Sequence, residues 1–259
     1  MNERAINHLE NELEQGEFSF GETFSYGWDI WKSNLLVLIG IMIIFMVISV
    51  VMGFIPYGGS QLAGILINPA LMCGTYIFCA NATKGRGEFS NLFDGFSKWK
   101  ELVFLTLISY VIYIVCAVPF IYSLGIDNLS VLASGDPLVI RQSIPEFDVY
   151  NLLLLLPMII VGLLMSLSVP MLYFYDLGPI DALKYSARFI MNHFFMFLLF
   201  FFVVILVGCS GMILLFIGII ITIPIIFTMS FAAFSKMTNL EGYNSEEGQQ
   251  DLSQHIVES

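Results

Sequence analysis

Long apolar stretches dominate the pattern of this chain. Asp, Glu, Lys and Arg are missing from four of them, which run over 33–83, 102–126, 149–175 and 189–235. A membrane-crossing helix needs roughly 20 mostly apolar residues, so the two shorter stretches hold one such helix each and the two longer ones hold two each. Backbone groups in lipid must be bonded within their own segment, which requires helices. The pattern therefore predicts an all-α membrane protein with six transmembrane helices.

A turn must divide each of the two longer stretches. In the first, Pro56, Gly58 and Gly59 interrupt the apolar run, and in the second the best candidate is the cluster from Gly208 to Gly211. Clusters of Pro and Gly are the expected punctuation between helices. The expected spans are 35–55, 61–83, 102–124, 152–175, 194–207 with a few further residues, and 212–237.

Each pair of expected spans follows a short amphipathic segment. These segments cover about 19–33, 90–101 and 178–191, and in each one apolar residues recur every three or four positions, as on one face of a helix. Ser19 and Glu22 fit a capping box at the start of the first segment. All tryptophans of the chain lie in these segments, as is typical of helices in the headgroup plane of a membrane. The expected stripes are Phe20, Phe24, Trp28 and Trp31; Leu92, Phe93, Phe96 and Trp99; and Ile180, Leu183, Ala187 and Ile190.

The three segments also share residues in matching positions, which indicates an internal repeat. We therefore predict three units, each an interfacial helix followed by a transmembrane hairpin. The alternative is that any cytoplasmic segment leading into a span looks amphipathic, and the low identity between the units leaves this alternative open. Gly27, Trp31 and Lys32 recur with the same spacing as Gly95, Trp99 and Lys100, and Asn34 recurs as Asn192 where the chain enters the membrane.

Composition and charge fit this picture and give it an orientation. The 259 residues are 58% hydrophobic and 12% charged, whereas soluble domains carry about 25% charged residues. With six spans, every Lys and Arg except Arg141 falls on one side, and cytoplasmic loops carry the excess of these residues. Both termini are thus expected in the cytoplasm, as acidic, solvated tails over 1–17 and 238–259 around a transmembrane domain at 18–237. The net charge of −11 argues against a nucleic-acid partner.

The sequence contains no pattern typical of a catalytic, metal or cofactor site. His8, His193 and His255 are scattered and form no imidazole cluster. Ionisable residues are missing from the expected spans, which argues against an ion-coupled transporter. We therefore expect no enzyme activity, no cofactor and no metal. The cysteines lie in expected spans without ligand spacing and are expected to be small apolar core residues: Cys73, Cys79, Cys116 and Cys209.

Two stretches of the chain resemble a bacterial family of polytopic membrane proteins of unknown function. The first, Asn68–Trp99, has a Pro and a Gly in the second span, then a basic turn and an "LF-x-GF" helix; the second, Val169–Phe194, has the pattern "D-x-x-P-x-x-A-L-x-x-S". The family is related to the membrane domain found beside glycerophosphoryl diester phosphodiesterases. The resemblance implies a six-helix bacterial inner-membrane protein and no activity. The matching residues are Pro69, Gly74, Leu92, Phe93, Gly95 and Phe96, and then Asp176, Pro179, Ala182, Leu183 and Ser186.

The leading functional hypothesis is a non-enzymatic protein of the bacterial inner membrane that binds lipid or other membrane proteins. Basic residues beside the interfacial helices are the candidate contacts for lipid headgroups: Lys84, Arg86, Lys98, Lys100, Lys184 and Arg188. The alternative is a passive transporter or channel for a small or amphipathic solute, with a polar site inside the membrane at Asn68, Pro69, Ser166 and Ser168. A membrane-embedded enzyme is a remote third possibility, and the sequence leaves the oligomeric state open.

Overall fold

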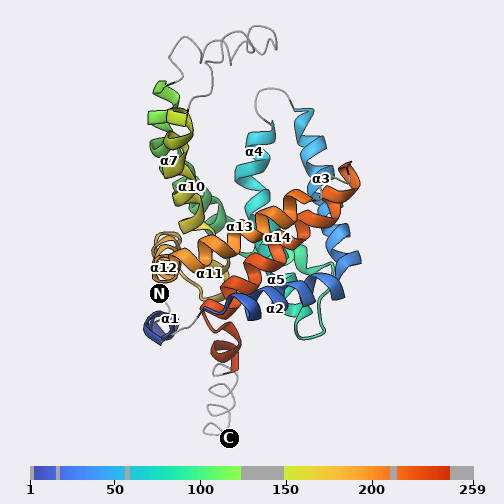
Figure 1. The fold of residues 1–259 in the computed structure, drawn as a ribbon. Coiled ribbons are helices and arrows are strands. Elements are labelled where there is room, and N and C mark those ends of the chain that lie inside the picture. Colours follow the sequence, from blue (N-terminus) through green and yellow to red (C-terminus); the bar gives the residue numbers. More distant parts are fainter. Residues whose placement is uncertain (1–2, 16–17, 56–58, 124–148, 211–214, 246–259) are drawn as a thin grey trace, which may run out of the picture.

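The structure is a computed structural model that describes residues 3–15, 18–55, 59–123, 149–210 and 215–245 (Figure 1). In these ranges every assigned element is a helix, which confirms the all-α expectation for this part of the chain. The helices are α1 (Glu3–Gln15), α2 (Phe20–Ser33), α3 (Leu35–Gly53), α4 (Gly59–Leu66), α5 (Asn68–Ala82), α6 (Asn91–Asp94), the 3-10 turn η1 (Gly95–Lys98), α7 (Trp99–Ser123), α10 (Val149–Met165), α11 (Ser168–Phe174), α12 (Pro179–Asn192), α13 (Phe194–Ser210) and α14 (Leu215–Met237).

Length and composition make three to five membrane spans possible among the described residues. Leu35–Gly53, Asn91–Ser123 and Leu153–Phe174 each suffice alone. Two more pass as bent pairs, α4 with α5 at 43° and α12 with α13 at 96°. The C-terminal helix offers only a shorter apolar run, Ile221–Met237. The fold is therefore that of an all-helical protein with several candidate spans, fewer than the six expected.

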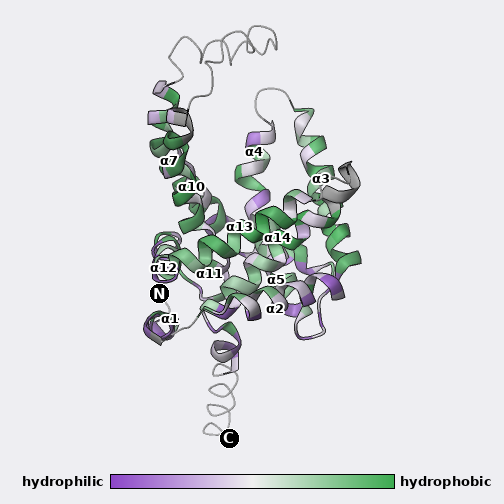
Figure 2. Cartoon of the chain, in the orientation of Figure 1, coloured by the Kyte–Doolittle hydropathy of each residue, from purple (hydrophilic) through white to green (hydrophobic). Residues whose placement is uncertain are grey.

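Polar residues gather at one end of the molecule. In the view of Figure 1, α3 and α4 form one upright pair of helices and α7 and α10 form another, while α1, α2 and α12 lie below them. Coloured by hydropathy, the upright helices are mostly apolar, and the hydrophilic residues lie around α1, the end of α2 and the turn after α5 (Figure 2). This distribution is the one expected of a protein with one face at a membrane surface.

The second half of α14 forms the centre of the packing. Its residues from Thr228 to Phe234 are all buried, and α2 lies along it. A Cβ atom at Gly27 of α2 would lie 2.8 Å from the Met229 Sδ atom and 3.1 Å from the Ala232 Cβ atom, so the glycine permits this close approach. The interfacial helix α2 is therefore fixed to the body of the protein by a tight contact between helices.

The N-terminal segment is not a solvated tail, contrary to expectation. It forms α1, in which Ala5 and Leu9 are fully buried. The Arg4 guanidinium donates to the Tyr243 carbonyl oxygen at 3.2 Å, and His8 Nε2 lies 3.0 Å from the Thr238 carbonyl oxygen. The acidic residues occupy the outer face of an amphipathic helix, so a high charge did not exclude an ordered contact. Of the expected C-terminal tail, residues 246–259 lie outside the described ranges.

The second interfacial segment is not a separate helix. Expected at 90–101, it runs through α6 and η1 directly into α7, and Asn91–Ser123 is one helical stretch of 33 residues. The capping box of the first segment is also wrong, since α2 begins at Phe20 after Ser19 but the Ser19 side chain makes no capping hydrogen bond. In both cases the local signal was present and packing with other helices decided the geometry instead.

The expected apolar stripes coincide only in part with the buried faces of their helices. On α12, Ile180 is 55% exposed, whereas the buried face includes Ala182, Ser186 and Phe189. On α2 the aromatic side chains are only partly buried and stack on one another along the helix, while the buried residues are Thr23, Gly27 and Ile30. Small residues thus make the helix contacts, and the large apolar residues flank them.

Candidate membrane-interface site

The break between α4 and α5 is bridged by a tryptophan from the second interfacial segment. Pro69, near the start of α5, has no N–H, and the Ala70 N–H bonds to the Ile67 carbonyl oxygen at 3.1 Å. This leaves the Leu66 carbonyl oxygen without its usual helical donor. The Trp99 indole N–H donates to it at 2.5 Å. Trp99 therefore satisfies a backbone group that the proline break exposes.

The first interfacial helix makes the same contact with α14. The Trp31 indole N–H donates to the Ile221 carbonyl oxygen at 3.1 Å. Ile221 precedes Pro224 by three residues, as Leu66 precedes Pro69. The two tryptophans have matching positions in the sequence pattern. Each indole N–H bonds to a carbonyl oxygen that lies three residues before a proline.

At the break between α10 and α11, a serine of α12 has the bridging role. Helix α10 ends at Met165 and α11 begins at Ser168, so the helix is broken between them. The Ser186 hydroxyl of α12 donates to the Leu164 carbonyl oxygen at 2.6 Å and accepts from the Leu167 N–H at 3.2 Å. One buried side chain therefore satisfies both sides of the break.

Two glycines of the family-like motif bring α5 and the α6–η1 segment into backbone contact. A Cβ atom at Gly74 would lie 1.9 Å from the Leu92 carbonyl oxygen, and one at Gly95 would lie 2.0 Å from the Ala70 carbonyl oxygen. No side chain fits at either position. The "LF-x-GF" pattern therefore encodes a close helix contact, with Leu92 fully buried beside it.

The first and third interfacial helices end in the same backbone conformation. Asn34 after α2 has φ −123° and ψ 20°, and His193 after α12 has φ −124° and ψ 32°. This match shifts the expected correspondence of Asn34 by one residue, from Asn192 to His193. With this register, Ser186 takes the place of Gly27, because each lies seven residues before the cap residue of its helix, Asn34 or His193. All three interfacial segments thus present a small residue to the helix on which they dock.

The two family-like stretches meet through an ion pair. The Lys98 ammonium group donates to the Asp176 carboxylate and lies 5.8 Å from the centre of the Tyr173 ring. The hydrogen bond and charge of Lys98 lower the pKa of Asp176 below its ordinary value. Asp176 also has φ 51°, a left-handed conformation that Asp tolerates better than most residues. Asp176 therefore lies in the turn before α12, and Asp181 lies in the first turn of that helix.

The six candidate headgroup contacts are placed in two regions. Lys84, Arg86 and Lys100 are exposed near the polar end of α5 and α7, whereas Lys98 is held by Asp176. Exposed aromatic side chains lie in the same segment, with Phe89 41%, Phe93 50% and Phe96 39% exposed. We call these residues and Trp99 the basic–aromatic patch: Lys84, Arg86, Phe89, Phe93, Phe96, Trp99 and Lys100. On α12, Lys184 lies 3.3 Å from Asp181, and the Arg188 guanidinium lies 5.6 Å from the centre of the Tyr185 ring.

The residues of the expected intramembrane polar site belong to the two helix breaks. Asn68 and Pro69 begin α5, and Pro69 is buried. The Ser168 hydroxyl donates to the Met165 carbonyl oxygen at 2.7 Å across the α10–α11 break. The Ser166 Oγ atom is buried without a hydrogen-bond partner. Asn68, Pro69 and Ser168 thus belong to breaks between helices.

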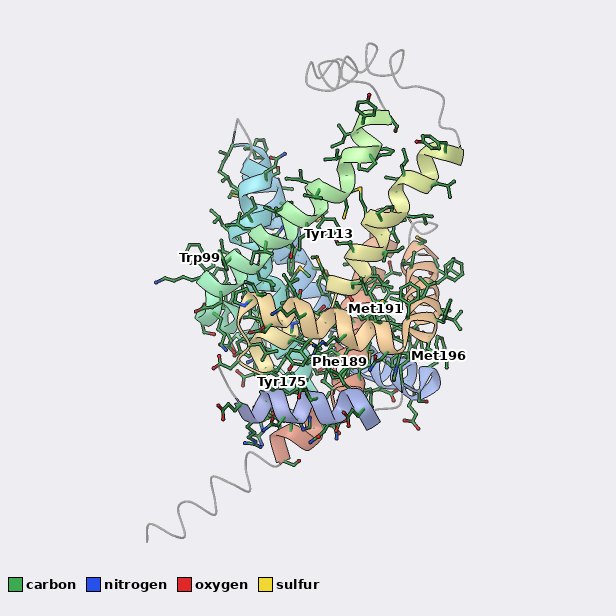
Figure 3. All side chains as sticks on the ribbon, turned by 90° about the vertical axis from the view of Figure 1, so that its left-hand side faces the viewer. Trp99, Tyr113, Tyr175, Phe189, Met191 and Met196 are labelled. Atoms are coloured by element: carbon green, nitrogen blue, oxygen red, sulfur yellow. The ribbon has the colours of Figure 1, made fainter. Side chains whose placement is uncertain are left out.

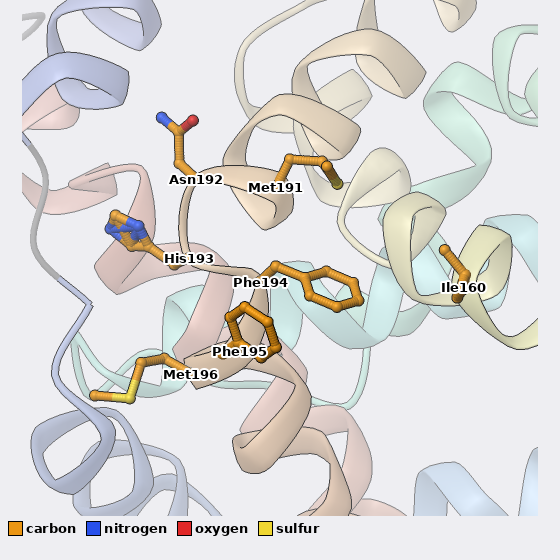
Figure 4. Close-up of a pocket in the computed structure, with 7 residues that line it drawn as sticks. All are labelled: Ile160, Met191, Asn192, His193, Phe194, Phe195 and Met196. Atoms are coloured by element: carbon orange, nitrogen blue, oxygen red, sulfur yellow. The ribbon is translucent and has the colours of Figure 1, made fainter.

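An apolar groove that the sequence reasoning missed lies at the bend between α12 and α13. It has a volume of about 590 Å³ and is lined by Ile160 of α10 together with Met191, Asn192, His193, Phe194, Phe195 and Met196 (Figure 4). Partial burial lowers the pKa of His193, which favours the neutral imidazole at pH 7. The run of Met and Phe after Asn192 was visible in the sequence, but the sharp bend that makes it a groove was not.

Among the described residues no group of three or more His, Cys, Asp or Glu side chains could hold a metal ion. Cys73 and Cys79 are buried, as expected of core residues, whereas Cys209 is exposed at the end of α13, contrary to expectation. The arrangement as a whole joins interfacial helices, broken helices and an apolar groove. A comparison of the chain with protein-family models, curated proteins and solved structures finds no match.

Proposed function

We propose that the chain is a six-span protein of the bacterial inner membrane with both termini in the cytoplasm. The contact between its ends supports an even number of crossings. The Asn239 side-chain amide donates to the Glu12 carboxylate at 3.0 Å, and the Tyr26 hydroxyl donates to the Glu241 carboxylate at 3.0 Å. Burial and the charge of Glu241 raise the pKa of Tyr26 to about 12, so the phenol remains protonated and can donate at neutral pH. Segments that touch in this way lie on one side of a membrane.

The proposed arrangement of three hairpins is supported by the way the interfacial segments dock. Helix α2 packs on α14, the α6–η1 segment on α5, and α12 on α10 and α11. Each interfacial segment therefore contacts the second helix of the preceding hairpin, and this helix contains a proline in each case. The segment of the first unit contacts the last unit in the same way. Equivalent contacts repeated around a closed ring are expected of three related units and would be a coincidence otherwise.

The proposed activity is non-enzymatic binding of anionic lipid at the cytoplasmic surface. The observation that carries this proposal is the basic–aromatic patch, where exposed aromatic rings and exposed Lys84, Arg86 and Lys100 belong to the same segment of the chain. Aromatic rings of interfacial segments enter the boundary between headgroups and acyl chains. Each basic residue near an anionic surface contributes about 1 kcal/mol of binding free energy. Partner membrane proteins remain a further possible ligand of the same surface.

Lipid binding is favoured over the alternative of a passive transporter or channel. That alternative requires an open polar path near Asn68 and Pro69. Ala70 and Cys73 beside them are fully buried, and Gly74 is in contact with the Leu92 backbone. Such packing supports a contact between helices at this break rather than a path for a solute. We also propose that the chain is related to the bacterial family of polytopic membrane proteins that its motifs resemble. The motif residues Gly74, Gly95, Asp176 and Ser186 all make contacts between segments.

Neutralising the basic–aromatic patch is expected to weaken the binding of anionic lipid. The variant combines Lys84→Gln, Arg86→Gln and Lys100→Gln, and the affinity of the full chain for phosphatidylglycerol would be measured by native mass spectrometry in detergent. Three lost charges predict a decrease of roughly tenfold or more, with little change for phosphatidylcholine. Glu88→Gln in the same turn is the matched control and should not weaken binding. An unchanged affinity in the triple variant would contradict the proposed function.

A further inference from the structure

The groove at the α12–α13 bend lies where an interfacial helix turns into a span. The two helices meet at 96°, and α12 lies across the lower ends of α7 and α10 (Figure 3). In the proposed orientation, α12 follows the membrane surface, and α13 leaves it at the bend and runs obliquely across the body of the protein (Figure 1). The corner between them is thus located at the boundary between headgroups and acyl chains, on the cytoplasmic side.

The walls of the groove are apolar and open. Met191 is 59% exposed, Phe195 83% and Ile160 on the facing wall 42%. In Figure 4, Met191 and Phe194 project toward Ile160, and His193 and Met196 lie on the other side of the bend. The side chains of Asn192 and His193 supply polar groups only at the corner itself, where the Asn192 amide donates to the Leu13 carbonyl oxygen at 2.9 Å.

The exposed apolar surface continues from the groove along α13. Leu198 is 41% exposed, Leu199 52% and Phe202 58%. This strip starts at the corner and follows α13 away from it. A helix docked from a partner protein would not require a strip that begins at a polar corner and follows one span.

Two basic residues stand beside the groove on the surface helix. Lys184 and Arg188 precede Met191 by seven and three residues, so they lie on or near the helix face of Met191. Both are exposed, and the acid next to them on α12 is Asp181, which pairs with Lys184. Glu10 of α1 also lies close by, because its carboxylate accepts from the Tyr185 hydroxyl at 3.3 Å, and the exposed side chains of Lys184 and Arg188 are the candidate contacts for an anionic phosphate group.

We propose that the groove binds one anionic glycerophospholipid of the cytoplasmic leaflet. One acyl chain lies between Ile160, Met191 and Phe194 and continues along α13, and the phosphate lies beside Lys184 and Arg188. A volume of about 590 Å³ is within the usual range for bound small molecules, about 300–1,000 Å³. This inference rests on the proposed orientation in the membrane and concerns a site separate from the basic–aromatic patch.

The test measures phosphatidylglycerol bound to the full chain by native mass spectrometry in detergent, with phosphatidylcholine as the neutral probe. Met191→Trp fills the groove and is expected to weaken phosphatidylglycerol binding at least fivefold. Lys184→Gln with Arg188→Gln is expected to weaken it roughly tenfold and to leave phosphatidylcholine binding unchanged. Thermal unfolding checks that each variant is folded, and Ile160→Trp replaces Met191→Trp if that variant does not fold.

Matched controls make the outcome decisive. Met46→Trp places the same side chain on α3 at a residue that is 51% exposed and should leave binding unchanged. Lys32→Gln removes a lysine that is paired with Asp29 at 3.4 Å, much as Lys184 is paired with Asp181. Loss of binding in the groove variants but not in these controls supports the site. Unchanged binding in the groove variants overturns the groove as a lipid site. If phosphatidylglycerol binding is lost only in the variant of the basic–aromatic patch, the proposed function still stands.

Discussion

Replacing Gly95 by alanine is expected to destabilise the protein by at least about 3 kcal/mol, or to prevent its folding. The new Cβ atom would lie 2.0 Å from the Ala70 carbonyl oxygen and 2.6 Å from the Gly74 backbone nitrogen. Overpacking against movable side chains typically costs about 1–3 kcal/mol, and backbone atoms of a buried helix cannot move aside as readily. The helices α5 and η1 must therefore separate. Thermal unfolding of the purified protein in detergent, followed by size-exclusion chromatography, measures the effect.

Gly21→Ala is the control for this prediction. Gly21 is also helical, but a Cβ atom there meets nothing within 4 Å. Alanine within a helix is favoured over glycine by about 0.5–1 kcal/mol, so this variant should be as stable as the original protein or slightly more stable. Equal stability of Gly95→Ala and Gly21→Ala would contradict the close contact between α5 and the second interfacial segment.

Ser186→Ala is expected to cost about 2–4 kcal/mol. The change leaves the Leu164 carbonyl oxygen and the Leu167 N–H without a partner at the α10–α11 break. Leu167 is fully buried, and leaving a buried polar group unsatisfied costs about 1–3 kcal/mol. The volume of the side chain changes little, so the loss reports the hydrogen bonds rather than packing. Chemical or thermal unfolding in detergent measures it.

Ser49→Ala separates this effect from the general loss of a hydroxyl in a span. The Ser49 hydroxyl donates to the Phe45 carbonyl oxygen at 2.8 Å within its own helix and bridges no break. Its removal should change stability by less than about 0.5 kcal/mol, as is usual for exposed positions. A similar cost for both serines would show that Ser186 has no special part in joining α10, α11 and α12.

The sequence predicted the helices well and their contacting faces poorly. Apolar periodicity placed the interfacial helices α2 and α12 within one or two residues, because helical spacing is a local property. The same periodicity gave one apolar stripe for each helix, but it did not identify Gly27 and Ser186 as the residues that make the close helix contacts. In a membrane, large apolar residues are as stable against lipid as against protein, so size and hydropathy do not identify the inner face.

Breaks in the spans were only partly predictable. Pro69 and Pro170 marked both places in the sequence, but a proline within a helix leads to a kink or to a full break depending on what bonds the freed backbone groups. Those donors are the Trp99 indole and the Ser186 hydroxyl, which come from distant parts of the chain. The groove at the α12–α13 bend was missed for the same reason, since its far wall, Ile160, belongs to another helix.

The most direct test of the proposed arrangement is the side of the membrane on which the C-terminal segment lies. Exposed Ser60, Ser90 and Ser245 would each be replaced by cysteine and treated in intact cells with a membrane-impermeant maleimide. Six spans predict that Ser60→Cys is labelled in intact cells, and that Ser90→Cys and Ser245→Cys are labelled only after permeabilisation. Five spans, without α14 as a crossing, would place Ser245 on the side of Ser60. Labelling of Ser245→Cys in intact cells would therefore contradict the three-hairpin arrangement.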